Sequence, residues 1–122
     1  MALLGSKDET LLLHNPRCSK SRAALALLEE RGESFRTRLY LEEPLTREEL
    51  EDLKGRLARP VAEWTRTGED PFKESGLDKD AGDAALIEAI EKHPILLQRP
   101  ILVRGERAAI GRPQADAILE LL

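Results

Sequence analysis

The sequence predicts an α/β fold: a mixed sheet flanked by helices, with an inserted helical segment. Two observations predict it. Near the start, a buried strand, a helix and a second strand follow one another closely, as in a βαβ unit with a parallel strand pair. Near the end, two short apolar runs flank a tight turn, as in a β-hairpin. A chain of 122 residues fits one domain. We therefore expect residues 1–122 to form one domain, with the helical insertion at about residues 43–92.

The first unit is read from residues 10–41. Residues 10–14 are a short apolar run that stops at Asn15-Pro16, which predicts a buried strand entering a turn. Good helix formers fill residues 19–31, and Gly32 offers a stop. Residues 35–41 alternate with a period of two, which predicts a strand that buries one face, that of Phe35, Thr37, Leu39 and Leu41.

The middle of the chain reads as helices. Thr46 and Glu49 form a capping box, and the helix that follows carries an apolar stripe of Leu50, Leu53 and Leu57. Leu45 and Leu50 are placed as its hydrophobic staple. We expect a short helix from Arg59-Pro60 through Trp64 to Arg66, a loop with a turn of helix over residues 68–76, and a helix over residues 83–92 with Leu86, Ile87 and Ile90 inward.

The last third returns to strands. Residues 101–103 and 108–110 flank residues 104–107, which predicts the hairpin. Residues 111–113 lead into a closing helix with Ile118 and Leu121 inward, and Pro113 sits where a first-turn proline is tolerated. Arg99-Pro100, just before the first hairpin strand, is a candidate cis peptide. This order of elements is typical of a thioredoxin-like (glutaredoxin-like) domain.

Composition excludes several classes of protein. Hydrophobic residues make up 41% and charged residues 34%, which argues for a globular core and against disorder. No apolar run approaches the roughly 20 residues of a membrane span, and the net charge of −4 argues against a nucleic-acid module. Residues 1–9 lack the pattern of a secretion signal, so we expect a cytoplasmic protein without membrane or nucleic-acid partners.

Cys18 is the only cysteine, so no intrachain disulfide can form. One cysteine and two histidines do not supply a four-ligand zinc site without further help, and we expect no metal. Cys18 is then an inert buried thiol, a nucleophile, or a redox centre whose partner comes from another molecule. Its polar neighbours Arg17, Ser19 and Lys20 favour a reactive thiol over a buried structural one.

The position of Cys18 favours a thiolate. The strand ends near His14 and the helix begins near Ser19, so Cys18 falls at the helix N-terminus, among unpaired backbone N–H groups and at the positive end of the dipole. Such a setting lowers a thiol pKa. Nearby arginine and lysine side chains add positive charge, and Ser21 is placed to hydrogen-bond the sulfur.

Spacing identifies a monothiol site. A dithiol enzyme would carry a second cysteine at the position of Ser21, and a cysteine phosphatase would carry arginine at the position of Ala24. A papain-like enzyme needs a downstream histidine, and His93, followed by Pro94, lacks a matching signature. A redox cycle would therefore use a thiol from solution such as glutathione, with no bound cofactor.

Three arginines have unusual surroundings. Arg99 follows an apolar stretch and precedes Pro100, in the loop that faces the cysteine in thioredoxin-like domains. Arg112 lies at a strand-to-helix junction, and Arg66 closes a short helix. Forked guanidinium groups suit a tetrahedral oxyanion, which makes Arg99 the strongest candidate for an anion clamp, ahead of Arg66 and Arg112.

The two histidines and the tryptophan have plainer interpretations. His14 either tunes the thiolate through charge or a hydrogen bond, or caps the strand end; the residues favour neither. His93 is expected to end its helix as a C-terminal cation. Trp64 is expected to pack in the core.

Two longer motifs carry a family resemblance: His14-Asn15-Pro16-x-Cys18-x-x-Ser21-Arg22 and His93-Pro94-Ile95-Leu96-x-x-Arg99-Pro100. With Arg66 and Arg112-Pro113, they resemble the glutaredoxin-coupled arsenate reductase family, of thioredoxin-like fold, over about residues 11–119. The resemblance implies arsenate reduction to arsenite in arsenic detoxification, with glutathione and glutaredoxin supplying electrons. It also implies roles for seven residues: Cys18 as nucleophile, Arg66, Arg99 and Arg112 as oxyanion ligands, and His14, Asn15 and Ser21 as residues that tune the thiolate.

Two other functions stay open at this level. One is a glutathione-dependent thiol-disulfide reductase in which Arg99 and its neighbours hold glutathione carboxylates. The other is a non-catalytic relative of transcription regulators that dock on RNA polymerase. Such regulators often use a two-cysteine switch, and Ser21 removes it here, so the regulator ranks last.

Overall fold

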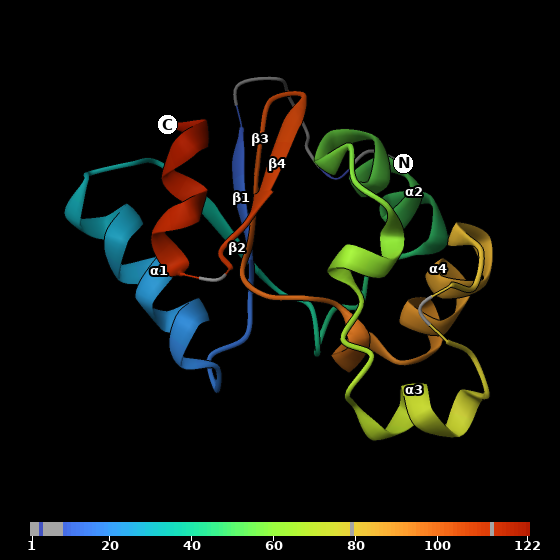
Figure 1. Cartoon of the computed structure of the whole chain (residues 1–122). Coiled ribbons are helices and arrows are strands. Elements are labelled where there is room, and N and C mark those ends of the chain that lie inside the picture. Colours follow the sequence, from blue (N-terminus) through green and yellow to red (C-terminus); the bar gives the residue numbers. More distant parts are fainter. Residues whose placement is uncertain (1–2, 4–8, 79, 113) are drawn as a thin grey trace.

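The computed structural model describes residue 3 and residues 9–78, 80–112 and 114–122. A four-stranded sheet stands between two helical layers, with α1 and the C-terminal η3 on one face and the segment containing α2 and α4 on the other (Figure 1). The elements in chain order are β1 (Thr10–His14), α1 (Ser19–Glu30), β2 (Arg36–Leu39), α2 (Arg47–Leu57), η1 (Val61–Trp64), α3 (Asp70–Ser75), α4 (Asp83–Lys92), η2 (Pro94–Leu96), β3 (Ile101–Arg104), β4 (Arg107–Ile110) and η3 (Ala115–Leu121).

The sheet has the predicted mixed, thioredoxin-like arrangement, in the order β2-β1-β3-β4. β1 runs parallel to β2, with His14 opposite Leu39, and antiparallel to β3, with Leu13 opposite Ile101. β3 and β4 are antiparallel, with Ile101 opposite Ile110. The ends of β1, β2 and β4 and the beginning of β3 therefore lie along one edge, which we call the site edge.

Alternation along the central strands builds two cores. Leu12 and Leu102 point to the face covered by α1 and η3, where they pack with Ala24, Leu28 and Ile118. The neighbouring residues on β1 and β3 point to the other face and join a larger cluster with the apolar stripes of α2 and α4. The helical segment at about residues 43–92 thus supplies the second face of the sheet with its cover.

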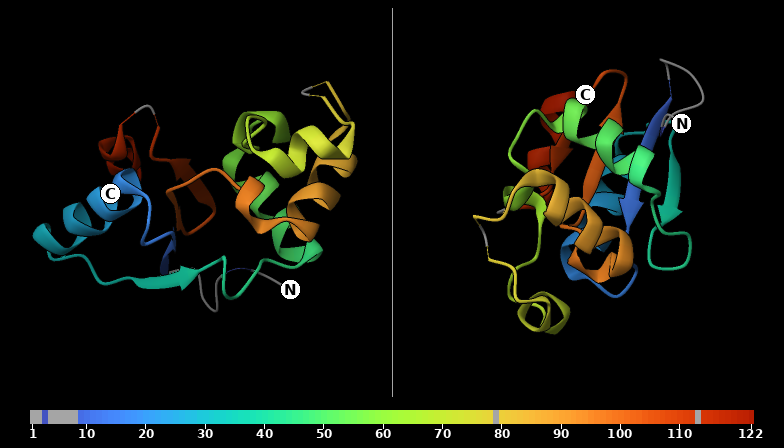
Figure 2. Two further views of the ribbon diagram at one scale, coloured as in Figure 1. Left: turned by 90° about the horizontal axis from the view of Figure 1, so that it is seen from below. Right: turned by 90° about the vertical axis from the view of Figure 1, so that its right-hand side faces the viewer.

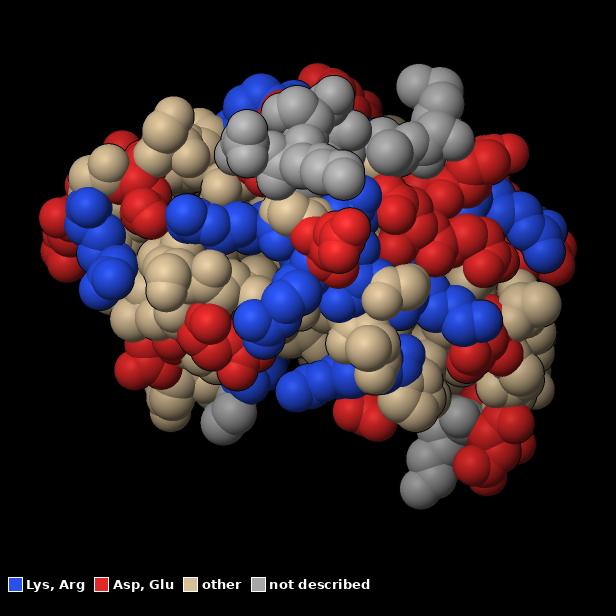
Figure 3. Space-filling model, turned by 90° about the horizontal axis from the view of Figure 1, so that it is seen from above, with Lys and Arg blue, Asp and Glu red and all other residues tan. Residues whose placement is uncertain are grey.

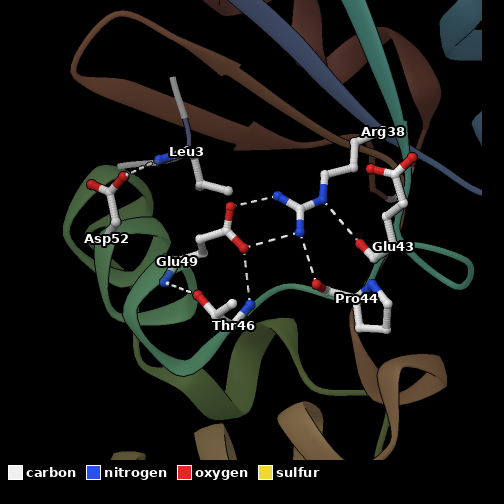
Figure 4. A network of polar contacts seen from close by, with 7 residues as sticks. All are labelled: Leu3, Arg38, Glu43, Pro44, Thr46, Glu49 and Asp52. Atoms are coloured by element: carbon white, nitrogen blue, oxygen red, sulfur yellow. Dashed lines mark hydrogen bonds and ion pairs between the residues drawn. The ribbon is translucent and has the colours of Figure 1, made fainter. Parts of the chain in front are cut away.

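A polar network fixes α2 to the sheet (Figure 4). The predicted capping box is confirmed, because Thr46 Oγ1 accepts from the Glu49 N–H and Glu49 Oε1 accepts from the Thr46 N–H. Arg38 of β2 forms a two-pronged ion pair with Glu49, with Nη2 2.9 Å from Oε1. Burial alone would raise the pKa of Glu49, but Arg38 and Thr46 outweigh it and hold that pKa below its ordinary value.

The hairpin forms as predicted, with its strands extended to Arg104 and Arg107 and a two-residue turn of Gly105 and Glu106. Gly105 has a φ of +58°, a conformation that glycine adopts without steric cost. The Arg99-Pro100 peptide is cis, as the sequence suggested. The face at this turn carries basic and acidic side chains in a mixture (Figure 3). Near the turn, Arg104 pairs with Glu33, and Arg56, which also donates to the Gly105 carbonyl, pairs with Asp52.

The end of the first helix is as predicted, because Arg31 is its C-cap and Gly32 follows with a φ of +68°. Two other local predictions are wrong. β2 is shorter than expected and its burial is inverted at the end, because the sheet stops at Leu39 and the chain turns, so Tyr40 is buried and Leu41 is 41% exposed. The short helix after Pro60 ends at Trp64, because Thr65 bridges to Leu97 as extended chain.

The closing helix forms as predicted and is a 3₁₀ helix, η3, with Ile118 buried and Leu121 partly buried against the same core. The proposed first-turn role of Pro113 and the reading of residues 1–2 and 4–8 lie outside the described residues. Within the described part of the chain, no helix is long and apolar enough to cross a membrane.

Candidate functional site

Three of the predicted site residues meet at the site edge. Cys18 follows β1, Arg99 precedes β3 and Arg112 follows β4, and the strand register brings these three points together. The left panel of Figure 2 views this edge from below, with the start of α1 and the chain on either side of the hairpin gathered near the centre.

Cys18 is the N-cap residue of α1, as its sequence position predicted. The residue is only 8% exposed, but it belongs to neither apolar cluster. Burial alone would raise the pKa of the Cys18 thiol. The Ser21 N–H, the Arg99 side chain and the Lys20 N–H outweigh that effect, so the pKa of Cys18 lies below its ordinary value. The sulfur is therefore buried among donors that favour the thiolate.

The chain segments that carry Arg99 and Arg112 are hydrogen-bonded to each other. Arg112 Nη2 lies 3.7 Å from Cys18 Sγ, and Arg112 Nε donates to the Arg99 carbonyl at 2.8 Å. The Gly111 N–H donates to the Pro100 carbonyl at 2.8 Å, and a Cβ at Gly111 would lie only 2.5 Å from Pro100 Cγ. The absence of a side chain at Gly111 thus allows Arg112 and Arg99 to share one wall of the site.

Arg99 presents free donors. Its Nε and Nη1 are buried and have no hydrogen-bond partner in the described residues. A buried donor without an acceptor costs free energy, about 1–3 kcal/mol for a typical polar group. An anion with several oxygens would relieve that cost at both atoms.

Arg66 lies beside the chain segment that leads into Arg99. Its N–H donates to the Leu96 carbonyl at 2.7 Å, which ties its segment to the chain leading into Arg99. Its guanidinium forms an ion pair with Glu69, with Nη1 2.8 Å from Oε2. Arg66 is thus near the site edge but already paired, unlike Arg99.

The three residues expected to tune the thiolate form a network beneath the cysteine loop. Ser21 Oγ lies 2.8 Å from His14 Nδ1 and accepts from the Asn15 N–H at 2.9 Å. The expected hydrogen bond from Ser21 to the sulfur is made by its backbone N–H, because the hydroxyl is bonded to His14 and to the Asn15 N–H.

Asn15 and His14 also act through the loop. The Asn15 carbonyl accepts from the Cys18 N–H at 3.0 Å, and its Oδ1 accepts from the Arg17 N–H at 3.0 Å. Burial and then the charge of Arg22 lower the pKa of His14, so its imidazole is neutral near pH 7 and brings no charge to the thiolate.

Sequence reasoning missed Tyr40. It follows β2 at the site edge, is 1% exposed, and its hydroxyl has no partner in the described residues. The parallel pairing of β1 and β2 was the signal that could have found it, since it places the residues after both strands at one edge.

An open cavity of about 250 Å³ adjoins the cysteine loop on the β2 side; its lining is His14, Asn15, Pro16, Arg17, Leu39, Leu41 and Glu42. Among the described side chains, no cluster of three or more His, Cys, Asp or Glu is arranged to hold a metal ion.

Comparisons with known proteins agree on one family. The model of the ArsC family matches residues 13–120. A protein named arsenate reductase from Neisseria meningitidis serogroup A is 47% identical over 107 residues, which cover 86% of this chain and 92% of that protein. Another of that name from Haemophilus influenzae is 40% identical, covering 92% of this chain and 97% of that protein.

A solved structure agrees with the fold. The arsenate reductase from Vibrio cholerae superposes with a TM-score of 0.87 at 40% identity, covering 94% of this chain and 98% of that one. The likeness therefore extends over the sheet, both helical layers and the site edge.

Proposed function

The chain belongs to the ArsC family, and from this premise we propose that it reduces arsenate to arsenite with Cys18 as the nucleophile. The observation that carries the proposal is the meeting of a thiolate-favouring Cys18 with Arg112 and with the unpaired, buried donors of Arg99. A thiolate and an arsenate repel each other, and the guanidinium groups of Arg99 and Arg112 near the sulfur offset that repulsion.

The first step is attack on arsenic. The Cys18 thiolate forms an S–As bond with As(V), and one As–O bond breaks. The leaving oxygen departs as hydroxide, which a solvent proton converts to water. Arsenic stays As(V) at this stage. Arg99 and Arg112 hold the remaining oxygens and the charge that they carry.

The second step supplies the electrons. We propose glutathione as the co-substrate: its thiolate attacks the Cys18 sulfur, an S–S bond forms, the S–As bond breaks and its electron pair stays on arsenic. Arsenic leaves as As(III), arsenite, and Cys18 is left in a mixed disulfide with glutathione. The thiolate of glutaredoxin then attacks the glutathione sulfur and returns Cys18 to its thiolate. The single cysteine is the reason for assigning the second thiol to another molecule.

A coupled turnover assay tests the proposal. With arsenate, glutathione, glutaredoxin, glutathione reductase and NADPH, the wild type should oxidise NADPH only when arsenate is present, and Cys18→Ser should be inactive. Arg99→Ala should lower kcat/KM for arsenate by about 100–1,000-fold. The matched control is Arg107→Ala, an exposed arginine at the opposite edge of the sheet, which should leave kcat/KM unchanged.

The same assay separates the alternative enzyme. A wild type that shows no arsenate-dependent oxidation, yet reduces glutathione mixed disulfides through Cys18, would overturn arsenate reduction in favour of a thiol-disulfide reductase. Equal kcat/KM values in wild type and Arg99→Ala would remove Arg99 from the oxyanion site.

A further inference from the structure

Tyr40 places an unsatisfied hydroxyl in the interior of the protein. In the described residues, three buried side-chain nitrogen or oxygen atoms have no hydrogen-bond partner, and they belong to two residues: Tyr40 Oη, Arg99 Nε and Arg99 Nη1. Buried polar groups are almost always paired, so an unpaired one in a native fold needs an explanation. The ring of Tyr40 packs in the larger apolar core, where phenylalanine would serve equally well.

The unpaired atoms share one neighbourhood. Tyr40 follows β2 at the edge where Cys18 follows β1 and Arg99 precedes β3. The charge of Arg99 acts most strongly on the Tyr40 hydroxyl, and the charges of Cys18 and Arg66 act on it more weakly. The Asn15 side chain also lies near enough to act on the hydroxyl, although its placement does not meet the geometry of a hydrogen bond. The hydroxyl therefore lies within electrostatic reach of the thiolate and of the guanidinium groups assigned to the oxyanion.

The chemistry of these atoms indicates their ligand. The two nitrogens of Arg99 can only donate hydrogen bonds. Burial raises the pKa of Tyr40, and this effect exceeds the opposing charges, so the hydroxyl keeps its proton at neutral pH and can donate as well. Donors without acceptors, beside a sulfur anion, are satisfied together by a ligand that brings several acceptor oxygens.

We propose that Tyr40 is a catalytic residue of the oxyanion site, whose hydroxyl donates a hydrogen bond to an oxygen of the bound arsenate. The inference rests on the proposed function and extends it by one residue. The hydroxyl is closed to solvent, so its bond to the oxyanion forms without competition from water, which strengthens it. The free protein bears the cost of the unpaired hydroxyl, and substrate binding removes it.

The test is Tyr40→Phe, which deletes the hydroxyl and keeps the ring. Binding is measured without turnover, as protection of Cys18 from iodoacetamide by inorganic arsenate and, separately, by inorganic phosphate. The oxyanion concentration for half-protection should rise tenfold or more in Tyr40→Phe, and the Tm should be unchanged or higher because no bonded group is lost. The matched control, Thr10→Val, removes a hydroxyl from a buried residue at the opposite edge and should leave half-protection unchanged.

The result that would overturn the inference is equal half-protection in wild type and Tyr40→Phe. If the wild type did not turn over arsenate, that result would count against the proposed function. The protection assay would still show whether the Tyr40 hydroxyl contributes to oxyanion binding. Should Tyr40→Phe fail to fold, the chain's single tyrosine can be replaced by 3-fluorotyrosine. Its ¹⁹F resonance should then shift on saturation with arsenate, and an unchanged resonance would contradict the contact.

Discussion

The sulfur of Cys18 is shielded from solvent by polar groups. At the residue scale this distinction matters, because an apolar surrounding would keep the thiol protonated, whereas N–H groups and guanidinium groups favour the anion. The loop that carries the sulfur is itself held down, since the Arg22 side chain donates to the Pro16 carbonyl at 2.9 Å and Ser21 binds both His14 and Asn15.

The pH dependence of Cys18 alkylation follows from these contacts. Only the thiolate reacts with iodoacetamide, so a lowered pKa moves the midpoint of the rate–pH profile to lower pH than that of a free thiol such as glutathione. Removal of a cation that favours the thiolate raises the midpoint, so Cys18 in Arg99→Ala should titrate at higher pH than in the wild type. Restricted access of iodoacetamide to the sulfur slows the reaction at every pH without moving the midpoint.

The control is Arg107→Ala, whose midpoint should match that of the wild type. A wild-type midpoint at or above that of glutathione would contradict the thiolate, and identical midpoints in wild type and Arg99→Ala would show that Arg99 does not act on the sulfur.

At this scale the sequence predicts positions better than contacts. Cys18 at the start of a helix and Arg99 before a proline are local signals, and the structure places both as expected. The bond of the Ser21 hydroxyl and the burial of Tyr40 depend on neighbours from other elements. A strand pattern assigns Tyr40 to the exposed face, and only the turn after Leu39 reverses that assignment.

At the scale of elements, the boundaries follow capping chemistry where it is explicit. Thr46 and Glu49 fix the start of α2, and His93 ends α4 as its C-cap. The far end of α2 has no such signal, because Ala58 takes a left-handed conformation with φ of +53°, which alanine rarely adopts. The spacing of apolar residues also does not predict that η1, η2 and η3 are 3₁₀ helices, because that spacing does not distinguish 3₁₀ helices from α-helices.

The placement of Arg99 and Arg112 depends on Gly111, which joins the end of β4 to the segment after it. Gly111→Ala would place a methyl group against Pro100, whose ring cannot bend away, and against the backbone at Ala115. We expect a loss of stability of about 1–3 kcal/mol from overpacking. Because Arg112 follows directly, its displacement should also lower kcat/KM for arsenate by up to about 100-fold.

Gly55→Ala is the matched control for that substitution. Gly55 lies within α2 with no atom near the added methyl group, so alanine there should stabilise the fold by about 0.5–1 kcal/mol and leave turnover unchanged. Urea unfolding and the turnover assay measure both effects. Equal unfolding free energies in wild type and Gly111→Ala would refute the close packing of Gly111 on Pro100.

At the scale of the whole molecule, topology explains why distant residues form one site. One parallel and two antiparallel pairings bring three strand ends and one strand beginning to a single edge, so Cys18, Tyr40, Arg99 and Arg112 meet although they span most of the chain. The βαβ unit and the hairpin were predictable because each is local. The pairing of β1 with β3, which joins them, follows from the fold expected for that order of elements and from no local pattern.

The central claim is that arsenate drives formation of a disulfide between Cys18 and glutathione. The most direct measurement is to mix the protein with glutathione, with and without arsenate, in the absence of glutaredoxin, and to record the intact protein mass and the arsenite released. We predict one glutathione on Cys18 and one arsenite per chain with arsenate, and neither without it. Arsenite absent from the reaction, or equal glutathione incorporation in both samples, would contradict the claim.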